Sequence, residues 1–282
     1  MDTLELLVRT HFTLVAAEKG TMLKDVIGYG SGFMMSYKGY KFFVTAAHVN
    51  EPTWSTRSEE VEIKNNDIAI ATHLSCEQNG VKQTVYVPIG DFLYVNEFKV
   101  DPSNFDFPAA VEEAERNPVP VDVAVALVKE RPGIFTYSDD ISKEVENADW
   151  EEKSKIIFPY EAVVDPDKDD HYFVFGRIKF EPRNDEEGHT FIYSEPRFHV
   201  DMEYISNLSD HVLCFKATED IDYDEWAGIS GAPILNPEGY IVGIASSVFE
   251  GTPYMFGLDI NIVRPFFDIL IQEETGNSVS GG

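Results

Sequence analysis

Residues 228–233 read Gly-Ile-Ser-Gly-Ala-Pro, a serine between two glycines, closed by a proline. Glycine allows backbone angles and close approaches that other residues avoid, and proline restricts both itself and the residue before it. The stretch therefore predicts a tight, rigid loop that exposes the Ser230 hydroxyl. The backbone N–H groups of Gly228 and Ser230 would then point into one small space, as a nucleophilic serine with an oxyanion hole requires. Isolated matches of this kind are more often ordinary turns, so the interpretation depends on a base and a carboxylate elsewhere.

A histidine ends a second distinctive stretch. Residues 41–49 read Lys-Phe-Phe-Val-Thr-Ala-Ala-His-Val, an apolar run that predicts a buried strand stopping at His48. A lone histidine at a strand end is more often a core residue bonded to a backbone carbonyl. Beside a candidate nucleophile, His48 becomes the candidate base.

A carboxylate opens a third stretch. Residues 121–129 are almost continuously apolar, which is typical of a central strand, and Asp122 stands at its start. Because burying an unpaired charge is costly, this side chain needs hydrogen-bond donors. It is either a turn or cap residue or the partner of a histidine.

The remaining periodic stretches are short and strand-like. Further strands are expected at residues 11–17, 28–36, 61–64, 67–71, 84–88, 92–95, 171–180, 191–205, 211–217, 240–247 and 253–260. Turns are expected at residues 37–40 and 236–239, a short helix at 109–116 and a terminal helix at 264–273. Two sets of about six short strands give an all-β pattern.

Composition limits the classes of protein and partner. The 282 residues include 22 Lys and Arg against 50 Asp and Glu, a formal net charge of −28. Such a charge disfavours nucleic acid and anionic membranes as partners. A generic acidic surface and a surface that steers basic substrates are both compatible with it.

The cysteine count and the hydropathy indicate an intracellular setting. Only Cys76 and Cys214 are present, which excludes a disulfide-rich secreted scaffold. The first residues lack a secretory leader pattern, and no run of about 18 apolar residues predicts a membrane helix. We therefore expect a cytoplasmic protein.

Four motifs together resemble trypsin-like serine proteases of the PA clan, which have the chymotrypsin-type fold. The resemblance is greatest to the bacterial and heat-shock-type branch, which lacks the disulfides of the secreted branch. The motifs, within residues 10–270, are Gly-Ser-Gly-Phe at 30–33, Phe-Val-Thr-Ala-Ala-His-Val at 43–49, Asp-Val-Ala-Val-Ala-Leu at 122–127 and the serine loop at 228–233.

The resemblance implies a fold and a division of the chain. The expected fold is all-β, two six-stranded antiparallel Greek-key β-barrels with a C-terminal α-helix. Residues 1–137 would form the N-terminal barrel with His48 and Asp122, and 138–170 an acidic linker. Residues 171–275 would form the C-terminal barrel with Ser230 and the terminal helix, and 276–282 a flexible tail.

The resemblance also implies a chemistry. Ser230 would attack a peptide carbonyl, and His48 would take its proton and later give it to the leaving amine. Asp122 would orient the imidazole and stabilise the imidazolium. The amides of Gly228 and Ser230 would bind the oxyanion, an effect worth about 3 kcal/mol per donor in comparable enzymes.

Two positions need separate treatment. Asp67, in Asn-Asp-Ile-Ala-Ile, is the alternative triad carboxylate, but it follows His48 so closely that few strands fit between them, and Asp122 is favoured. Ile229 replaces the aspartate with which digestive relatives capture a new N-terminus after zymogen cleavage. We therefore expect no such activation.

Specificity is harder to predict. Asp224 lies six residues before Ser230, where trypsin has its pocket acid, so it is either the determinant of a basic P1 residue or an ordinary exposed acid. Residues Ser246, Ser247 and Val248 would supply the strand edge that pairs with the substrate backbone.

The main functional hypothesis is a serine endopeptidase, acting through an acyl-enzyme on a polypeptide substrate that is basic if Asp224 lines the P1 pocket. The alternative is a catalytically silent trypsin fold that binds peptides or acts as a scaffold. No cofactor or metal site is expected, because the histidines at 171, 189, 199 and 211 are scattered. Neither nucleic acid nor a membrane is an expected partner.

Overall fold

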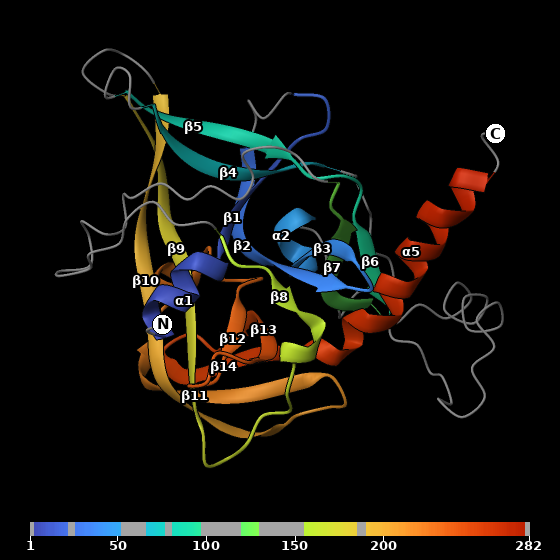
Figure 1. Cartoon of the computed structure of the whole chain (residues 1–282). Coiled ribbons are helices and arrows are strands. Elements are labelled where there is room, and N and C mark those ends of the chain that lie inside the picture. The colour runs from blue at the N-terminus through green and yellow to red at the C-terminus, as the bar shows by residue number, and fades with distance from the viewer. Residues whose placement is uncertain are drawn as a thin grey trace.

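The computed structural model describes residues 3–21, 26–51, 66–76, 81–96, 120–129, 155–184 and 190–279. Two β-structured units lie side by side, with a helix near each end of the chain (Figure 1). The expected strand at 61–64 and the expected helix at 109–116 lie outside the described residues.

The N-terminal unit is a sheet of mainly antiparallel strands. They are β1 (Phe12–Ala17), β2 (Val26–Tyr37), β3 (Tyr40–Thr45), β4 (Asp67–Cys76), β5 (Val81–Pro88), β6 (Leu93–Asn96), β7 (Pro120–Leu127) and β8 (Phe158–Pro159). The order is β5-β4-β1-β2-β3-β7-β6, and β8 pairs in parallel with β2. Seven strands follow one another in this order, where a six-stranded barrel was expected. In the described part of the chain, no hydrogen bonds pair β5 with β6, so the sheet is not closed into a barrel there.

The turn between β2 and β3 shows how local sequence sets a hairpin. Lys38 and Gly39 have φ angles of 49° and 82°, and the strands pair Tyr37 with Tyr40 across them. Two successive left-handed residues form the type I′ turn, whose twist matches that of a β-hairpin. The predicted turn at residues 37–40 is confirmed.

The C-terminal unit is a closed six-stranded barrel. Its strands are β9 (His171–Asn184), β10 (Thr190–Asn207), β11 (Val212–Ile221), β12 (Pro233–Leu235), β13 (Ile241–Val248) and β14 (Thr252–Asp259). The order around the barrel is β10-β11-β14-β13-β12-β9, so β12 pairs with β9 and β13 and not with β11, which precedes it. This crossed order is a Greek key, and the predicted all-β, two-unit fold with a terminal helix is confirmed.

The helices correct two sequence predictions. They are α1 (Thr3–Thr10), α2 (Ala47–Asn50), α4 (Tyr223–Trp226) and α5 (Arg264–Val279), with 3-10 turns η2 (Tyr160–Ala162) and η3 (Ile260–Val263). Helix α1 was not expected. Helix α5 runs beyond the predicted residue 273, so 276–279, predicted as flexible tail, are helical.

The predicted division of the chain stays a prediction, but two contacts cross it. Strand β8 and η2 belong to the range predicted as linker, 138–170, and β8 adds to the N-terminal sheet at β2. Helix α1, in the range predicted for the N-terminal barrel, packs against β9 and β12 of the C-terminal barrel.

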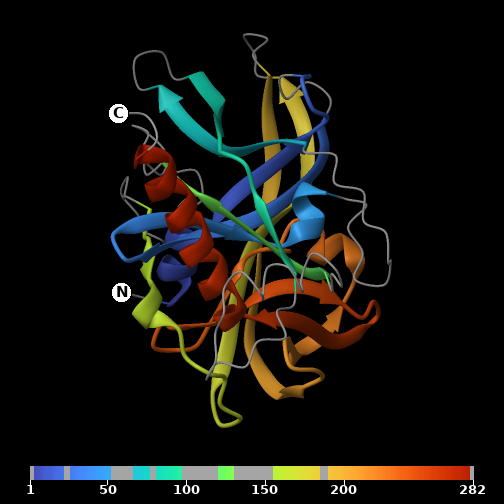
Figure 2. The same cartoon turned by 90° about the vertical axis from the view of Figure 1, so that its right-hand side faces the viewer.

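One buried cluster contains residues of both units and of the two terminal helices, α1 and α5. It combines Phe33 and Phe42 of the sheet with Phe175 of the barrel, Leu7 of α1 and Phe267 of α5. Figure 2 shows α5 lying across the N-terminal sheet, where it contacts β7. No helix in the described ranges has the length and apolar character needed to cross a membrane.

Candidate active site

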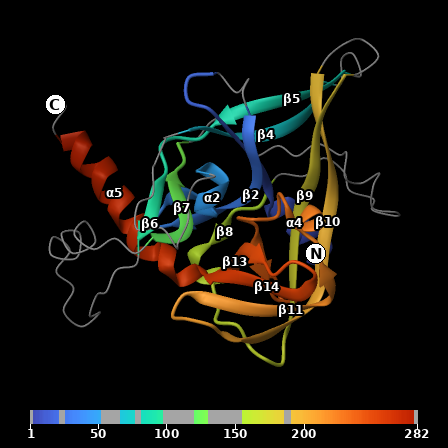
Figure 3. The same ribbon diagram turned by 180° about the vertical axis from the view of Figure 1, so that it is seen from behind.

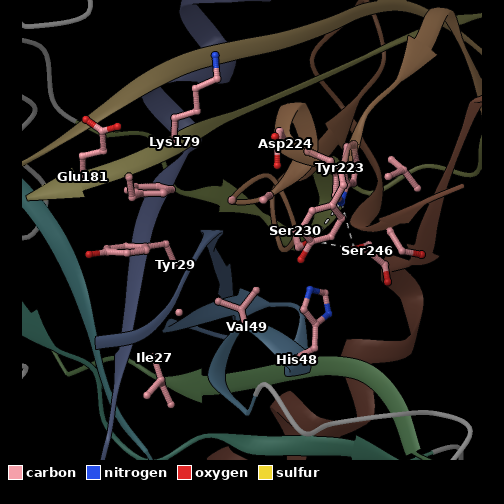
Figure 4. A pocket seen from close by; sticks show the side chains of 17 residues that line it. Ile27, Tyr29, His48, Val49, Lys179, Glu181, Tyr223, Asp224, Ser230 and Ser246 are labelled. Carbon is pink, nitrogen blue, oxygen red and sulfur yellow. Dashed lines mark hydrogen bonds between the residues drawn. The ribbon is translucent and has the colours of Figure 1, made fainter. Parts of the chain in front are cut away.

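A cavity of about 870 Å³ opens between the two units. The N-terminal sheet and α2 supply its lower wall in Figure 4, including Tyr29 and His48. The barrel and α4 supply the opposite wall, where Figure 4 shows Ser230, and Phe180 of the barrel also lines the cavity. Both short helices, α2 and α4, are in view when the molecule is seen from behind (Figure 3).

His48 lies on α2 and not at the end of a strand, as the sequence suggested. Strand β3 ends at Thr45, and one helical turn follows it. The prediction failed because an apolar run does not reveal where a buried strand passes into a buried helix. The turn directs the imidazole into the cavity (Figure 4).

The His48 ring is bonded to Asp122. Its Nδ1 lies 2.8 Å from Oδ2 and 3.0 Å from Oδ1, and the backbone N–H of His48 donates to Oδ1 at 3.0 Å. The Ser246 hydroxyl donates to Oδ2 at 2.6 Å. These donors compensate the burial of the carboxylate at the start of β7, and they leave Nε2 of His48 as the nitrogen available to the cavity.

Asp122 changes the proton affinity of His48. Burial by itself lowers the pKa of the imidazole, but the charge of Asp122 and its hydrogen bond outweigh that effect. The pKa of His48 is therefore raised above its ordinary value. An imidazole whose pKa is raised in this way is suited to receive a proton near neutral pH.

Asp67, the alternative carboxylate, lies elsewhere. It begins β4, where it pairs with Ala17 of β1, and its Oδ2 accepts a bond from the N–H of Gly20 at 2.7 Å. Of the two aspartates, only Asp122 contacts His48, and this geometry favours Asp122 over Asp67 as the partner of the imidazole.

Ser230 lies in the same cavity, with its hydroxyl turned toward the barrel. Oγ donates to the carbonyl of Ser246 at 2.8 Å and receives a bond from Trp226 Nε1 at 3.2 Å. Among the described residues, no hydrogen bond joins Ser230 to the His48 ring, although Figure 4 shows the ring facing the serine. Rotation about the single side-chain torsion of serine moves the hydroxyl between staggered positions.

Two amides of the loop around Ser230 have no backbone acceptor in the described part of the chain. Gly228 and Gly231 have φ angles of 114° and 91°, which glycine adopts without strain. The N–H groups of Ile229 and Gly231 donate to the carbonyls of Trp226 and Ala245. In the described part of the chain, the N–H groups of Gly228 and Ser230 have no such acceptor, and both residues line the cavity.

The predicted substrate-binding residues also line the cavity. They are Asp224 on α4 and Ser246, Ser247 and Val248 at the end of β13. Ser246 has a second role that the sequence did not predict, because its hydroxyl holds Asp122. Asp224 is exposed.

Three further cavity residues were missed. Tyr29 of β2 stacks on Phe180 of β9, with ring centroids 4.3 Å apart, and Nε1 of Trp226 donates to the Ser230 hydroxyl. A single aromatic residue in a strand or a short helix gives no sequence signal that separates a residue of a cavity wall from a residue of the core. No group of three or more His, Cys, Asp or Glu side chains suited to a metal occurs in the described ranges.

No protein-family model and no curated protein matches the chain. A solved structure, human heparin binding protein, is 14% identical, covers 93% of this chain and 91% of its own, and has a TM-score of 0.50. The chain has the chymotrypsin-type fold. This is the fold of trypsin-like serine proteases, which the four motifs predicted.

Two other solved structures are similar to this chain at lower TM-scores. The serine endoprotease from Yersinia pestis is 16% identical over 96% of this chain, with a TM-score of 0.45, and this chain spans 66% of its length. The active form of Rv3671c protease from M. tuberculosis is 14% identical, covers 93% of this chain and 81% of its own, and has a TM-score of 0.42.

Proposed function

We propose that this protein is a serine endopeptidase with Ser230 as nucleophile, His48 as general base and acid, and Asp122 as the carboxylate. The observation that carries the proposal is the bonded pair of His48 and Asp122, which opens into the cavity that Ser230 and its loop line. A nucleophile, a base and an orienting group around one cleft is the arrangement that acyl transfer requires.

The reaction would proceed in two stages. A peptide carbonyl enters between His48 and the loop, and the N–H groups of Gly228 and Ser230 bind the oxygen as it becomes negative. Nε2 of His48 takes the Ser230 proton as Oγ bonds to the carbonyl carbon, and it then protonates the leaving amine as the C–N bond breaks. Water, activated by His48, releases the acid and restores the serine.

Substrate recognition would use both walls of the cavity. The edge formed by Ser246, Ser247 and Val248 would pair with the peptide backbone. The exposed carboxylate of Asp224 would attract a basic P1 side chain. Replacing Asp224 with Ser should reduce cleavage after Arg or Lys relative to cleavage after Leu, and unchanged ratios would leave Asp224 an ordinary surface acid.

A silent peptide-binding fold is the second candidate. The observation that favours it is the Ser230 hydroxyl bonded to the Ser246 carbonyl and not to His48. The human neighbour is named for binding heparin, but heparin is polyanionic and would be repelled by this chain, whose net charge is −28. The cytoplasmic location stays a prediction.

A fluorophosphonate probe separates the two candidates, because it bonds only to an activated serine. Wild-type protein should be labelled at Ser230, and both Ser230→Ala and heat-denatured wild type should not be. Folded wild-type protein that resists labelling would overturn the enzyme and leave the binding module.

A further inference from the structure

Ser31, in the Gly-Ser-Gly stretch at residues 30–32, is buried behind the Ser230 loop and contacts it twice. Its backbone N–H donates to the carbonyl of Ser230 at 2.9 Å, and its hydroxyl donates to the carbonyl of Gly228 at 2.6 Å. One residue of the N-terminal sheet therefore donates hydrogen bonds to the carbonyls of Gly228 and Ser230, two residues apart in a loop of the barrel.

The position of Ser31 is itself closely determined. Its carbonyl accepts a bond from the Thr45 hydroxyl at 2.7 Å. A Cβ on Gly30 would lie 2.4 Å from Val49, and one on Gly32 would lie 2.2 Å from Phe43, so both neighbours must be glycine for β2 to pack here. The Ser31 side chain is thus fixed against the loop by the sheet around it.

His11, just after α1, completes the contact. Its Nε2 lies 2.7 Å from the Ser31 hydroxyl, and its ring packs edge-on against Phe175. The Ser31 hydroxyl has one proton, and the Gly228 carbonyl can only accept, so that proton goes to Gly228 and Nε2–H of His11 must donate to Ser31. Burial, with the charges of Lys155 and Arg177 adding to it, lowers the pKa of His11 well below its usual value, which fits a neutral ring.

The consequence for the loop is geometric. The peptide between Gly228 and Ile229 is bonded at both ends, by Ser31 at its oxygen and by the Trp226 carbonyl at its N–H. The peptide groups that carry the N–H groups of Gly228 and Ser230 flank this fixed peptide, and in the described part of the chain neither N–H has a backbone acceptor. Glycine offers little resistance to a change of backbone conformation, so this loop needs an external restraint.

We propose that Ser31 and His11 are positioning residues that hold the loop of residues 226–231 in the conformation in which the amides of Gly228 and Ser230 face the cavity. The proposal rests on the proposed function of that site and adds a residue pair that touches no substrate. Ser31 acts on the loop directly, and His11 acts only through Ser31.

The test measures labelling by a fluorophosphonate, whose phosphoryl oxygen occupies the place of the oxyanion. Ser31→Ala should lower the maximal labelling rate about 10-fold, less than the 10²–10³ lost when an oxyanion donor is removed, with the concentration for half-maximal rate unchanged. His11→Phe should lower it less, and His11→Gln, which keeps an N–H donor, should restore it. The double variant should equal Ser31→Ala alone, because His11 acts through the hydroxyl that is missing.

Thr10→Val is the matched control. It removes a buried hydroxyl next to His11 whose bonds run to the carbonyls of Leu6 and Leu7 within α1. Its labelling rate should stay at the wild-type value. Additive losses in the double variant, or an equal loss in Thr10→Val, would show a general structural effect and overturn the proposal.

If the wild type is not labelled at all, the proposed endopeptidase activity is refuted. Hydrogen exchange still tests the positioning role of Ser31 in that case. The amides of Ile229 and Gly231, bonded to the carbonyls of Trp226 and Ala245, should exchange faster in Ser31→Ala than in Thr10→Val. Equal exchange would overturn the positioning role whatever the activity. If Ser31→Ala fails to fold, His11→Phe takes its place in both measurements.

Discussion

At the scale of single residues, His48 combines two opposed influences. Burial lowers the pKa of its imidazole, whereas the charge and hydrogen bond of Asp122 raise it, and Asp122 prevails. The carboxylate thereby also determines the pH range in which the ring is neutral. A base of this kind works only above its own pKa.

The first prediction concerns pH. In the wild type, kcat/KM for a peptide substrate should fall as the pH drops through the raised pKa of His48, above 6.5, because the imidazolium cannot accept the Ser230 proton. An NMR titration of the His48 ring should give the same midpoint. His199 is the internal control, since burial and then the charge of Arg197 lower its pKa to about 4, so its ring should stay neutral there.

The linkage to stability has a definite sign. A histidine whose pKa is raised by folding stabilises the native state fully below pH 6.5, and this contribution is lost as the pH rises through the folded pKa. The stability difference between wild type and His48→Gln should therefore shrink with rising pH. A difference that grows instead would contradict the raised pKa.

The second prediction assigns the carboxylate. Asp122→Asn should lower kcat about 10⁴-fold, since it imposes the wrong imidazole tautomer. Asp67→Asn should leave kcat near the wild-type value, because Asp67 binds the Gly20 amide at the start of β4 and not His48. The reverse order of effects would transfer the role to Asp67.

The third prediction concerns Gly231. A Cβ there would lie 2.1 Å from the Ser31 carbonyl oxygen and 2.4 Å from Thr45 Oγ1, at a φ of 91°. Gly231→Ala should cost about 3 kcal/mol of unfolding free energy through overpacking and left-handed strain. Gly251→Ala, with a φ of 68° and open space around it, should cost about 1 kcal/mol. Equal losses in urea unfolding would show that the close approach to Ser31 has little weight.

At the scale of elements, α5 packs against the N-terminal sheet. Phe267 is fully buried, and its ring stacks on Phe42 of β3 with centroids 4.1 Å apart. On the same helix, Asp268 pairs with Lys38 of the β2–β3 turn at 2.7 Å, an exposed pair of small energetic value. Packing, and not charge, holds the helix on the sheet.

The fourth prediction follows from that packing. Phe267→Ala should lower the free energy of unfolding by about 3–5 kcal/mol, because it leaves a cavity in the cluster that joins both units. Phe249→Ala removes an equal side chain that is 62% exposed and should change stability by less than about 0.5 kcal/mol. Chemical denaturation of both variants measures the difference, and similar values would mean that α5 is not docked.

At the scale of the whole molecule, the net charge of −28 opposes compaction. Salt screens such repulsion, with a Debye length of about 10 Å at 0.1 M. The Tm at pH 7 should therefore rise between about 0.02 and 0.3 M NaCl, and the rise should shrink near the isoelectric point of about 4.4. An equal rise at both pH values would assign the effect to general salting-out.

The sequence by itself determined the local features. The alternation of apolar residues predicted most of the strands, and Asn236 and Gly239 bounded a predicted turn. The motifs named some of the side chains that line the cavity, His48 and Ser230 among them. These features are local because backbone preference and apolar period depend on neighbouring residues.

Only the tertiary structure decided which distant groups meet. It brought His48 to Asp122 and not to Asp67, placed the Ser246 hydroxyl on the same carboxylate, and set Ser31 behind Gly228, 197 residues away. It also put His48 on a helical turn, where an apolar run had indicated a strand. Such contacts depend on strand register and on the packing of two units around one core, which no short stretch of sequence encodes.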